Sequence, residues 1–485
     1  MHFKRIIKIF KYLIISFGIL FLIILAGVNL PFSQRIITQR VNGFLDKKHL
    51  PVQVDRITLL INGKIGLTGA RVIKVTGDTV VFAQKLRISV RILPILFRKV
   101  KVKSISLNDA IIHITSDPVT GKPDLMSLFS NDTAAVKEMN KPGKSGKKWD
   151  ISVNSMTLRN ILFTYNDKLN GIQINQAVGK MDVGFDTFSL INRQIYVTSI
   201  DLVKAHGKLV LKKSHNPKSN EKKSPGGWNF KLMKSSLSGL LFILDRPDEK
   251  KQYRFSLDNG EFSRVGFDMS GSRISVARLM LDKPFILLYS SRADLKPEAG
   301  SKVTGGIDFP GQWNIAGDNL KINDGTFQTK RYDIESPLND VDSAILISRF
   351  NTTLKDVRLS NLESRFIMSR LSFELDNGLK LDKGEISFSS DSTGKSLLSA
   401  KLMTPSSRIN LNVEAGSELS ELISSWQSVP FSMKIKDTEI SARDIFAFFP
   451  HLKERSSLGA QENFRLGIDC NVKVKLVSLK SGVLL

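Results

Sequence analysis

The sequence predicts a mainly β protein that is attached to a membrane by one N-terminal transmembrane helix. Three observations lead to this fold class. Residues 12–30 carry no charge, apolar residues recur at every second position from Gln53 onward, and short apolar motifs and turn sequences repeat along the chain. We therefore expect the helix to be followed by an elongated, repeat-built antiparallel sheet with few short helices.

The uncharged stretch is long enough to cross a bilayer. Its nineteen residues are mainly Leu, Ile, Phe, Val, Ala and Gly, with Ser16 and Asn29 as polar interruptions. At about 1.5 Å per helical residue it reaches about 28 Å, close to the roughly 30 Å of a hydrocarbon core. The residues that we expect to form this anchor include Tyr12, Leu13, Phe17, Leu20, Phe21, Leu25 and Leu30.

The basic residues before the anchor predict its orientation. Residues 1–11 hold four cations that the positive-inside rule places in the cytoplasm, namely Lys4, Arg5, Lys8 and Lys11. The alternative is a cleaved signal peptide, whose apolar region is about 7 to 15 residues long and ends at a small-x-small site. Here the apolar run is longer, and Ala26–Asn29 is a poor cleavage signal. We expect a single-pass inner-membrane protein whose bulk lies in the periplasm.

The positive charge is concentrated in the first half of the chain. The formal net charge is +25; residues 1–250 hold 40 Lys and Arg against 17 Asp and Glu, and the remaining 235 residues hold 31 against 29. A basic group near an anionic lipid surface gains about 1 kcal/mol, so this excess favours a surface that faces a membrane or lipid headgroups. The alternative is that these charges keep solvent-facing strand positions soluble.

Residues 31–48 are expected to form an amphipathic helix directly after the anchor, with Ser33 as its N-cap. One side would carry the apolar residues Ile36, Ile37, Val41, Phe44 and Leu45. The other side would carry Arg35, Arg40 and Lys47. Such a helix would lie on the membrane surface or cover the start of the β domain, which we place at residues 49–485.

Period-two strands follow this helix. Apolar residues at 86, 88, 90 and 92 alternate with basic or polar residues at 85, 87, 89 and 91. Successive side chains of a strand point to opposite faces of its sheet. The segment therefore predicts a strand with one apolar face and one strongly basic face.

One apolar motif occurs four times. It reads Val100-x-Val102-x-Ser104-Ile105-x-Leu107 and returns from Ile151, from Ile195 and, more loosely, from Ile274. In each copy the apolar spacing slips by one residue at the Ser or Arg position. A β-bulge at the slip would keep the second pair of apolar side chains on the same face, so we expect a bend there.

A longer repeat begins at Trp149, Trp228 and Trp313, each of which is followed by a Leu and a Phe, and this suggests stacked multi-strand units.

Basic loops rich in Gly, Pro and Ser are expected near 134–148 and 212–227. Hairpin turns are predicted at Asp258–Gly260, Asn323–Gly325, Asp376–Gly378 and Asp382–Gly384. Short helices are expected after Ser417 and around residues 445–449. The last strand, from Val472, has no return strand, as expected of the N-terminal part of a longer protein.

The search for a catalytic or metal site returns none, and no cofactor is expected. The six histidines lack metal-ligand spacing, and His113 and His206 are expected to face solvent or to bond locally. Gly394–Ser396 imitates the end of a phosphate-binding loop, but Ser389 stands where that loop requires Gly. Cys470 is the single cysteine, which excludes an intrachain disulfide. Aromatic residues follow the apolar positions, so a nucleic-acid partner is not expected.

The chain resembles the N-terminal region of the AsmA-like superfamily, in particular its TamB-type translocation and assembly subunits. The resemblance rests on the basic N-terminus and single span, on Leu107-Asn-Asp-Ala-x-Ile hairpins, on Gly121-Lys-Pro-Asp-Leu-Met-Ser-Leu-Phe129, and on the Trp-Asn-Ile units. It implies an inner-membrane anchor and a periplasmic sheet curled into a taco-like groove with an apolar interior. It further implies roles in phospholipid transfer toward the outer membrane, in outer-membrane protein assembly and secretion, and an outer-membrane assembly protein as a partner. The chain lacks the C-terminal domain of TamB-type members.

The leading hypothesis is thus a membrane-tethered, non-enzymatic protein whose groove holds phospholipid acyl chains. The residues that we expect to line the groove are Leu86, Ile88, Val90, Ile92, Val100, Val102, Ile105, Leu107, Ile151, Val153, Ile195 and Val197. The first alternative is an envelope scaffold or adaptor whose sheet edge pairs with client β-strands. A second alternative, an exported hydrolase, requires a site that the sequence does not offer.

Overall fold

The computed structural model describes residues 30–47, 50–60, 63–74, 77–91, 94, 99–117, 124, 150–189, 193–212, 229–269, 271–291, 313–332, 342–360, 363–391, 393–417, 429–449 and 464–474. Within these residues the protein is mainly β with few helices, as the alternating sequence predicts. The chain divides into two compact units, Met1–Asn220 and Glu221–Leu485, and each is described by itself.

The predicted transmembrane helix lies outside the described residues except for Leu30, and so do the four cations before it. In the part of the chain that the structure describes, no helix has the length and apolar character needed to cross a bilayer. The predicted loop 134–148 and nearly all of 212–227 also lie outside the described residues.

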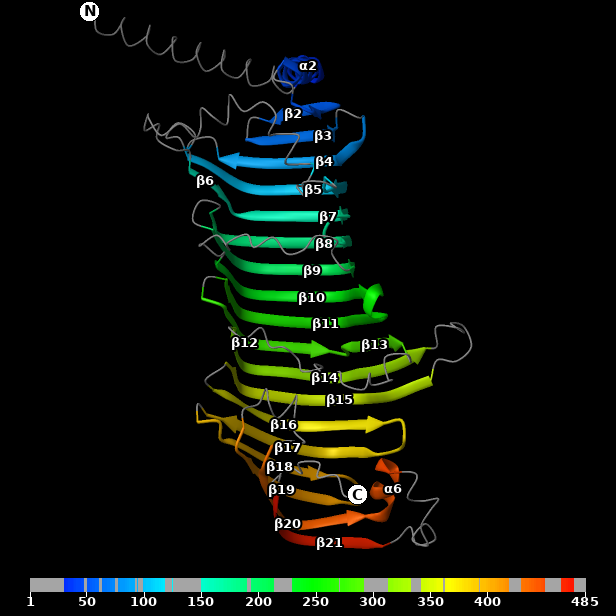
Figure 1. Cartoon of the computed structure of the whole chain (residues 1–485). Coiled ribbons are helices and arrows are strands. Elements are labelled where there is room, and N and C mark those ends of the chain that lie inside the picture. Colours follow the sequence, from blue (N-terminus) through cyan, green and yellow to red (C-terminus); the bar gives the residue numbers. More distant parts are fainter. Residues whose placement is uncertain are drawn as a thin grey trace, which may run out of the picture. The chain divides into compact units, whose positions relative to one another are not determined.

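The first unit begins with helix α2 and continues as a sheet whose strands lie side by side (Figure 1). Its elements are α2 (Pro31–Lys47), β1 (Val52–Gln53), β2 (Arg56–Leu60), β3 (Lys64–Ile73), β4 (Thr79–Arg91), β5 (Lys99–Thr115), β6 (Asp150–Val153), β7 (Ser155–Asp167), β8 (Ile172–Ser189) and β9 (Gln194–Leu211). β3 pairs with both β1 and β2, and β5 pairs with both β6 and β7, which follow each other along the same side of β5.

The second unit is likewise built from long neighbouring strands (Figure 1). Its elements are β10 (Asn229–Arg246), the 3-10 helix η2 (Pro247–Glu249), β11 (Lys251–Asp268), β12 (Arg273–Asp282), β13 (Phe285–Ser291), β14 (Asn314–Tyr332), β15 (Asp342–Leu359), β16 (Ser364–Leu375), β17 (Lys380–Ser390), β18 (Ser396–Met403), β19 (Arg408–Ala415), β20 (Phe431–Ser441), α6 (Ala442–Phe448) and β21 (Arg465–Val474). β12 and β13 lie end to end between β11 and β14.

The expectation of a purely antiparallel sheet was wrong at two places. β5 runs parallel to β6 and β7, and β12 and β13 run parallel to β14. A parallel neighbour requires the chain to return to the end of the sheet from which it started, which takes a long connection. Both connections are long, since β5 ends at Thr115 and β6 starts at Asp150, while β13 ends at Ser291 and β14 starts at Asn314.

Helix α2 forms as predicted, and its most buried residues are polar, while the apolar Ile37, Val41 and Leu45 are half-buried. Gln34 and Thr38 are only 4% and 7% exposed, whereas the apolar Phe32 and Phe44 are 73% and 57% exposed. The Thr38 hydroxyl accepts a hydrogen bond from the Ile57 backbone N–H at 2.9 Å. Polar side chains of the helix thus serve as partners for backbone groups at the edge of the sheet, which would otherwise be unpaired.

Asn42 on α2 completes this edge contact. Its side-chain nitrogen donates to the Val54 carbonyl at 2.8 Å, and its side-chain oxygen accepts from the Val54 N–H at 3.2 Å. One amide side chain thus pairs with both backbone groups of Val54, which is 5% exposed. The helix satisfies part of the sheet edge in place of a further strand, and its exposed side keeps Leu30, Phe32, Ile36 and Phe44.

Three of the four predicted Gly turns were wrong. The sequence ending at Gly378 does turn between β16 and β17, where the Gly378 N–H donates to the Leu375 carbonyl and Gly378 has a φ of +85°. The sequences ending at Gly260, Gly325 and Gly384 lie inside β11, β14 and β17. Asn, Asp and Gly tolerate positive φ, which serves a bend within a strand as well as a turn between two strands.

The second predicted short helix is confirmed as α6. The Ser441 hydroxyl caps it by accepting from the Arg443 N–H. Phe446 packs inward at 8% exposed, while Phe448 and Phe449 remain exposed. The other predicted helix, after Ser417, lies outside the described residues, as do Trp149 and Trp228.

The third of the predicted tryptophan repeats begins directly before a strand. Trp313 precedes the first residue of β14, and its ring stacks on Phe267 of β11 at a centroid distance of 5.4 Å. The first residues of β6 and β10 likewise follow positions 149 and 228. The repeat therefore marks the starts of strands.

Candidate functional site

Apolar side chains form continuous rows across one face of the first unit. Ile88 of β4 lies opposite Ile105 of β5, and Leu86 lies opposite Leu107. Cross-strand neighbours on one face are close enough for their side chains to pack. One row consists of Leu67, Leu86, Leu107, Leu158, Met181 and Leu202, and the next of Ile65, Ile88, Ile105, Met156, Val183 and Ile200.

The register places most of the predicted lining residues in these rows or directly beside them. Val90 pairs with Val102, Val102 with Val153, and Val100 with Ile151 in backbone register. Ile195 and Val197 of β9 lie opposite Phe188 and Phe185 of β8. Ile92 lies outside the described residues. In the first unit, the motif copy on β5 thus lies in register beside the copy on β6 and β7.

The predicted strand bend is found in every copy of the apolar motif. The pairing of β4 with β5 skips Lys103, and the pairing of β8 with β9 skips Thr198. Asn154 separates β6 from β7, and the pairing of β11 with β12 skips Arg264 and Ala277 together, without a shift in register. In each copy the irregular residue immediately precedes the Ser or Arg at which the sequence spacing slips. At Lys103 and Thr198 the irregularity is a one-residue bulge that keeps the apolar residues on one face, as expected.

A second line of bends crosses the first unit near the middle of its strands. Asp109, Asn160 and Lys204 have φ values of 54°, 53° and 55°, although they lie inside β5, β7 and β9. The pairing of neighbouring strands skips these residues. Ala110 and Leu107 consequently belong to one apolar cluster, although an unbent strand would place them on opposite faces.

No described element covers this apolar face. The substantial contacts in the described part of the first unit join sheet neighbours, or join α2 to β1 and β2 at the sheet edge. Ala83, Ala110 and Ile161 are buried, but the larger Leu86, Leu107 and Leu158 are only half-buried. A second packed layer would bury these side chains fully. The described sheet is therefore a single layer with an accessible apolar side.

The second unit has an equivalent apolar face. One row joins Phe262, Leu279, Leu320, Leu354, Met368, Ile386, Ala400, Leu411 and Ile435. Beside it, the rings of Phe366 and Phe388 stack at 5.6 Å. Among the described elements of this unit, helices contact strands substantially only where η2 meets β11 and where α6 meets β20. This face also lacks a described second layer.

The opposite face of the first unit is polar and, over β3–β5, basic. Lys85 and Arg87 are exposed there, and an open cavity of about 630 Å³ lies beside them. Further along the same face, Asp182 of β8 is 2.8 Å from the Lys180 ammonium and accepts from the Thr157 hydroxyl at 2.7 Å. These hydrogen bonds hold the pKa of Asp182 below its ordinary value of 3.8. Asp182 thus pairs with a cation on its own strand and with a hydroxyl on the neighbouring strand.

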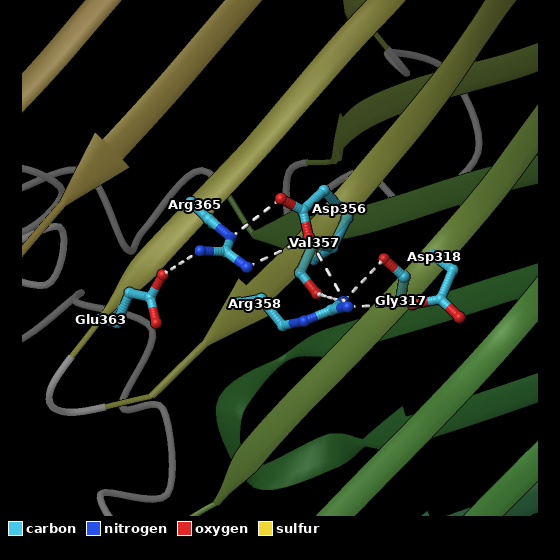
Figure 2. Close-up of polar contacts among 7 residues, drawn as sticks. All are labelled: Gly317, Asp318, Asp356, Val357, Arg358, Glu363 and Arg365. Atoms are coloured by element: carbon cyan, nitrogen blue, oxygen red, sulfur yellow. Dashed lines mark hydrogen bonds and ion pairs between the residues drawn. The ribbon is translucent and has the colours of Figure 1, made fainter.

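A chain of ion pairs joins β14, β15 and β16 in the second unit (Figure 2). Arg358 lies 3.1 Å from Asp318 and 3.5 Å from Asp356. Arg365 lies 2.9 Å from Asp356 and 2.6 Å from Glu363. Asp356 has a φ of 49° at a strand bend, so its carboxylate holds two arginines at an irregular point of the sheet. Two arginines and three carboxylates thus link the three strands by ion pairs.

The remaining candidates for chemistry are structural. The described residues contain no cluster of three or more side chains suited to hold a metal ion. The His113 ring nitrogen lies 2.5 Å from the Thr164 hydroxyl, and His206 is exposed, as expected for both. Gly394 and Lys395 lie in the turn between β17 and β18, where their N–H groups donate to Asp391. Cys470 is half-buried on β21.

Sequence reasoning missed part of the basic surface. The alternation identified Lys85 and Arg87, but Lys64 of β3 and Lys103 of β5 line the same cavity. Lys64 lies opposite Ser89 of β4, and this register places it at the cavity. Such a cluster depends on strand register, which a single strand's sequence does not carry.

The fold and its surfaces define a class of protein: a mainly β protein whose described sheet has an uncovered apolar face and a polar, partly basic face. Comparisons of the chain with protein-family models, with curated proteins and with solved structures find no match.

Proposed function

We propose that this protein is a membrane-tethered carrier that accommodates phospholipid acyl chains on the apolar face of its sheet. The observation that carries the proposal is the pair of rows through Leu107 and Ile105, whose members are half-buried except for the buried Val183 and are covered by no described element. Each methylene of an acyl chain that leaves water on this face gains about 0.8 kcal/mol. The charged headgroup stays in water, and the lipid moves along the face without a chemical step.

Two further features support an attachment to a membrane. Residues 12–30 are uncharged, and α2, which follows directly, exposes Phe32 and Phe44. Exposed apolar side chains on a helix insert favourably at a lipid interface. We place the protein in the inner membrane with its bulk in the periplasm. Its role would be phospholipid transfer toward the outer membrane, or assembly and secretion of outer-membrane proteins with an outer-membrane partner, as the AsmA/TamB-like resemblance implies.

The curvature of the sheet into a taco-like groove belongs to this proposal. Its support is the two lines of strand bends, which recur at matching places on neighbouring strands, for example at Lys103 of β5 and Asn154 between β6 and β7, and at Asp109 and Asn160. A bulge bends its strand and increases the local twist. Bends aligned across several strands curve the whole sheet in one direction, which would shelter an acyl chain from water.

Site-specific photocross-linking tests the proposal. A photoreactive residue is introduced into the full chain at Ile88, Ile105 or Ile200 on the apolar face, and the matched control is Asp201, which adjoins Ile200 on the polar face. After irradiation in membranes, mass spectrometry identifies attached phospholipid. We expect lipid adducts at the three isoleucine positions and none at Asp201. Equal labelling of Ile200 and Asp201 would overturn the proposal.

A second candidate function is an adaptor that pairs with client β-strands. The observation in its favour is that, within the described residues, β21 pairs with β20 alone. An added strand would gain main-chain hydrogen bonds along such an edge. In this case photoreactive residues at Lys473 on β21 would capture polypeptide, while Ile88 and Ile105 would capture no phospholipid.

A further inference from the structure

The cavity on the basic face of the first unit has the composition of an anion-binding site. It has a volume of about 630 Å³ and is lined by four cationic residues, Lys64, Lys85, Arg87 and Lys103, by hydroxyl residues that include Ser104 and Ser106, and by the apolar Leu60, Ile65, Leu67 and Ile88. No carboxylate is among its described lining residues. The volume lies within the range of about 300–1,000 Å³ that is common for small-molecule sites.

Strand register brings these cations together from three strands. Lys85 and Arg87 occupy alternate positions of β4 and share one face, about 7 Å apart along the strand. Lys64 lies on β3 opposite Ser89, and Ser89 pairs with Ser104 on β5. Neighbouring strands are about 4.8 Å apart, so a single small anion placed between them reaches side chains from all three strands.

Two backbone features shape the space beside Arg87. Gly66 lies opposite Arg87 on β3 and presents no side chain, so the floor of the cavity is open at that point. On the other side, Ser106 lies opposite Arg87 on β5, which places a hydroxyl next to the guanidinium. The bulge at Lys103 gives β5 an extra residue at the rim of the cavity.

Three of these cations have no ion-pair partner among the described residues, namely Lys85, Arg87 and Lys103. Elsewhere on β3, Arg71 pairs with Asp55, and directly after β3 Lys74 pairs with Asp124. Like charges on adjacent positions of a sheet repel each other. A bound anion relieves this repulsion, and Arg offers a planar pair of N–H donors that matches phosphate oxygens.

We propose that this cavity binds a phosphate ester. Arg87 contacts two phosphate oxygens, Lys85 and Lys103 supply positive charge from two strands, and Ser106 donates a hydrogen bond. The source of the phosphate is either a phospholipid headgroup or a soluble phosphate compound, and both present the same oxygens. Lys85 and Arg87 alternate with the row residues Leu86 and Ile88 and so project from the opposite face of β4, while Ile65, Leu67 and Ile88 of the rows also line part of the cavity. The proposal does not rest on the proposed lipid-carrying function.

Binding is measured with the full chain in a non-ionic detergent at about 150 mM salt, where nonspecific attraction is screened. The probes are dihexanoyl phosphatidic acid, inorganic phosphate and an uncharged dihexanoyl glycerol, each titrated calorimetrically. We expect phosphatidic acid to bind and the uncharged glycerolipid not to bind. If inorganic phosphate binds equally well, the phosphate alone is recognised; if it binds at least tenfold more weakly, the site recognises a lipid headgroup.

Matched double variants separate the site from general charge. Lys85→Gln with Arg87→Gln should weaken phosphatidic acid binding at least tenfold. Arg278→Gln with Lys355→Gln removes the same charge from exposed strand positions of the second unit and should leave the affinity unchanged. The conservative Arg87→Lys should give an intermediate loss because it keeps the charge without the paired donors.

Thermal unfolding of each variant establishes that it folds. Two results would overturn the proposal: no binding of either phosphate probe by the unmodified protein at millimolar concentration, or equal losses in the two double variants. Cross-linking at Ile105 and Ile200 in the Lys85→Gln, Arg87→Gln variant keeps the two proposals apart. Loss of phosphate binding while lipid adducts persist on the apolar face would concern the phosphate site alone. Loss of the adducts while phosphate binding persists would concern the lipid-carrying function alone.

Discussion

The Asn160 side-chain nitrogen donates a hydrogen bond to the Asp109 carboxylate at 2.8 Å, and both residues have positive φ inside their strands. They lie on β7 and β5, which run parallel, so the two bends are adjacent. The hydrogen bond joins the two irregular points directly. This contact therefore stabilises a shared bend of neighbouring strands, on which the continuity of the apolar face depends.

Substitution of Asn160 tests the energetic role of this bend. A β-branched residue is strained at a φ of 53°, so Asn160→Val should destabilise the first unit by about 1–3 kcal/mol relative to Asn160→Gly. Both variants lose the hydrogen bond to Asp109, and their difference isolates the backbone strain. Urea unfolding followed by circular dichroism measures it, and equal stability of the two variants would show that the bend relaxes.

Gly171 should be far less tolerant of substitution than Gly77. Both have positive φ, 68° and 90°, but a Cβ on Gly171 would lie 2.6 Å from the Lys212 carbonyl oxygen, whereas Gly77 has open space. Gly77→Ala should cost about 1–2 kcal/mol from φ alone. Gly171→Ala adds a clash with backbone, and the melting temperature should fall clearly further. A similar loss in both variants would contradict the close approach of Gly171 to Lys212.

Asn42 should hold α2 against the sheet edge. Asn42→Ala leaves both backbone groups of the buried Val54 without this partner, at a cost of about 1–3 kcal/mol. Hydrogen exchange at the Val54 amide should then accelerate at least tenfold. Gln39→Ala, on the exposed side of α2, is the matched control and should not change it. Unchanged Val54 exchange in Asn42→Ala would mean that the helix does not protect this edge.

The stabilisation that Asp182 gives the first unit should be lost in acid. Its pKa is depressed by hydrogen bonds from Lys180 and Thr157, so the stabilisation is present above the ordinary value of 3.8 and is lost as the pH falls through the lower folded pKa. Asp182→Asn should be less stable than the unmodified protein at pH 6, and the difference should shrink below pH 3.8. Urea unfolding at pH 6 and pH 3 measures this. A constant difference between the two proteins would contradict the assignment.

The alternating sequence was sufficient to predict that these segments are β-strands and which of their side chains share the apolar face. Apolar residues such as Ile88 and Ile105 recur with period two, and the slips before Ser104 and Ser199 mark the bulges found in the pairing. These are local properties, since the side-chain alternation of a strand and its interruption are written into neighbouring residues.

Local sequence was ambiguous where the same backbone conformation, with positive φ, suits both a turn between strands and a bend within a strand. The segment ending at Gly325 suits a turn and also a bend, and the structure places it inside β14, where Asp324 has a φ of 51°. The place of helix α2 was also left open by its sequence, since its apolar side suited either the membrane surface or the start of the β domain. In the structure Thr38 and Asn42 hydrogen-bond to the sheet edge.

The sequence by itself determined that the protein is mainly β, that one face of its strands is apolar, and that the strands bend at fixed positions. Tertiary structure decided which strands are neighbours, that β5 runs parallel to β7, and that Lys64, Arg87 and Lys103 line one cavity. The physical reason is that alternation is a property of a single strand. Neighbours and register arise from hydrogen bonds between segments far apart in the chain.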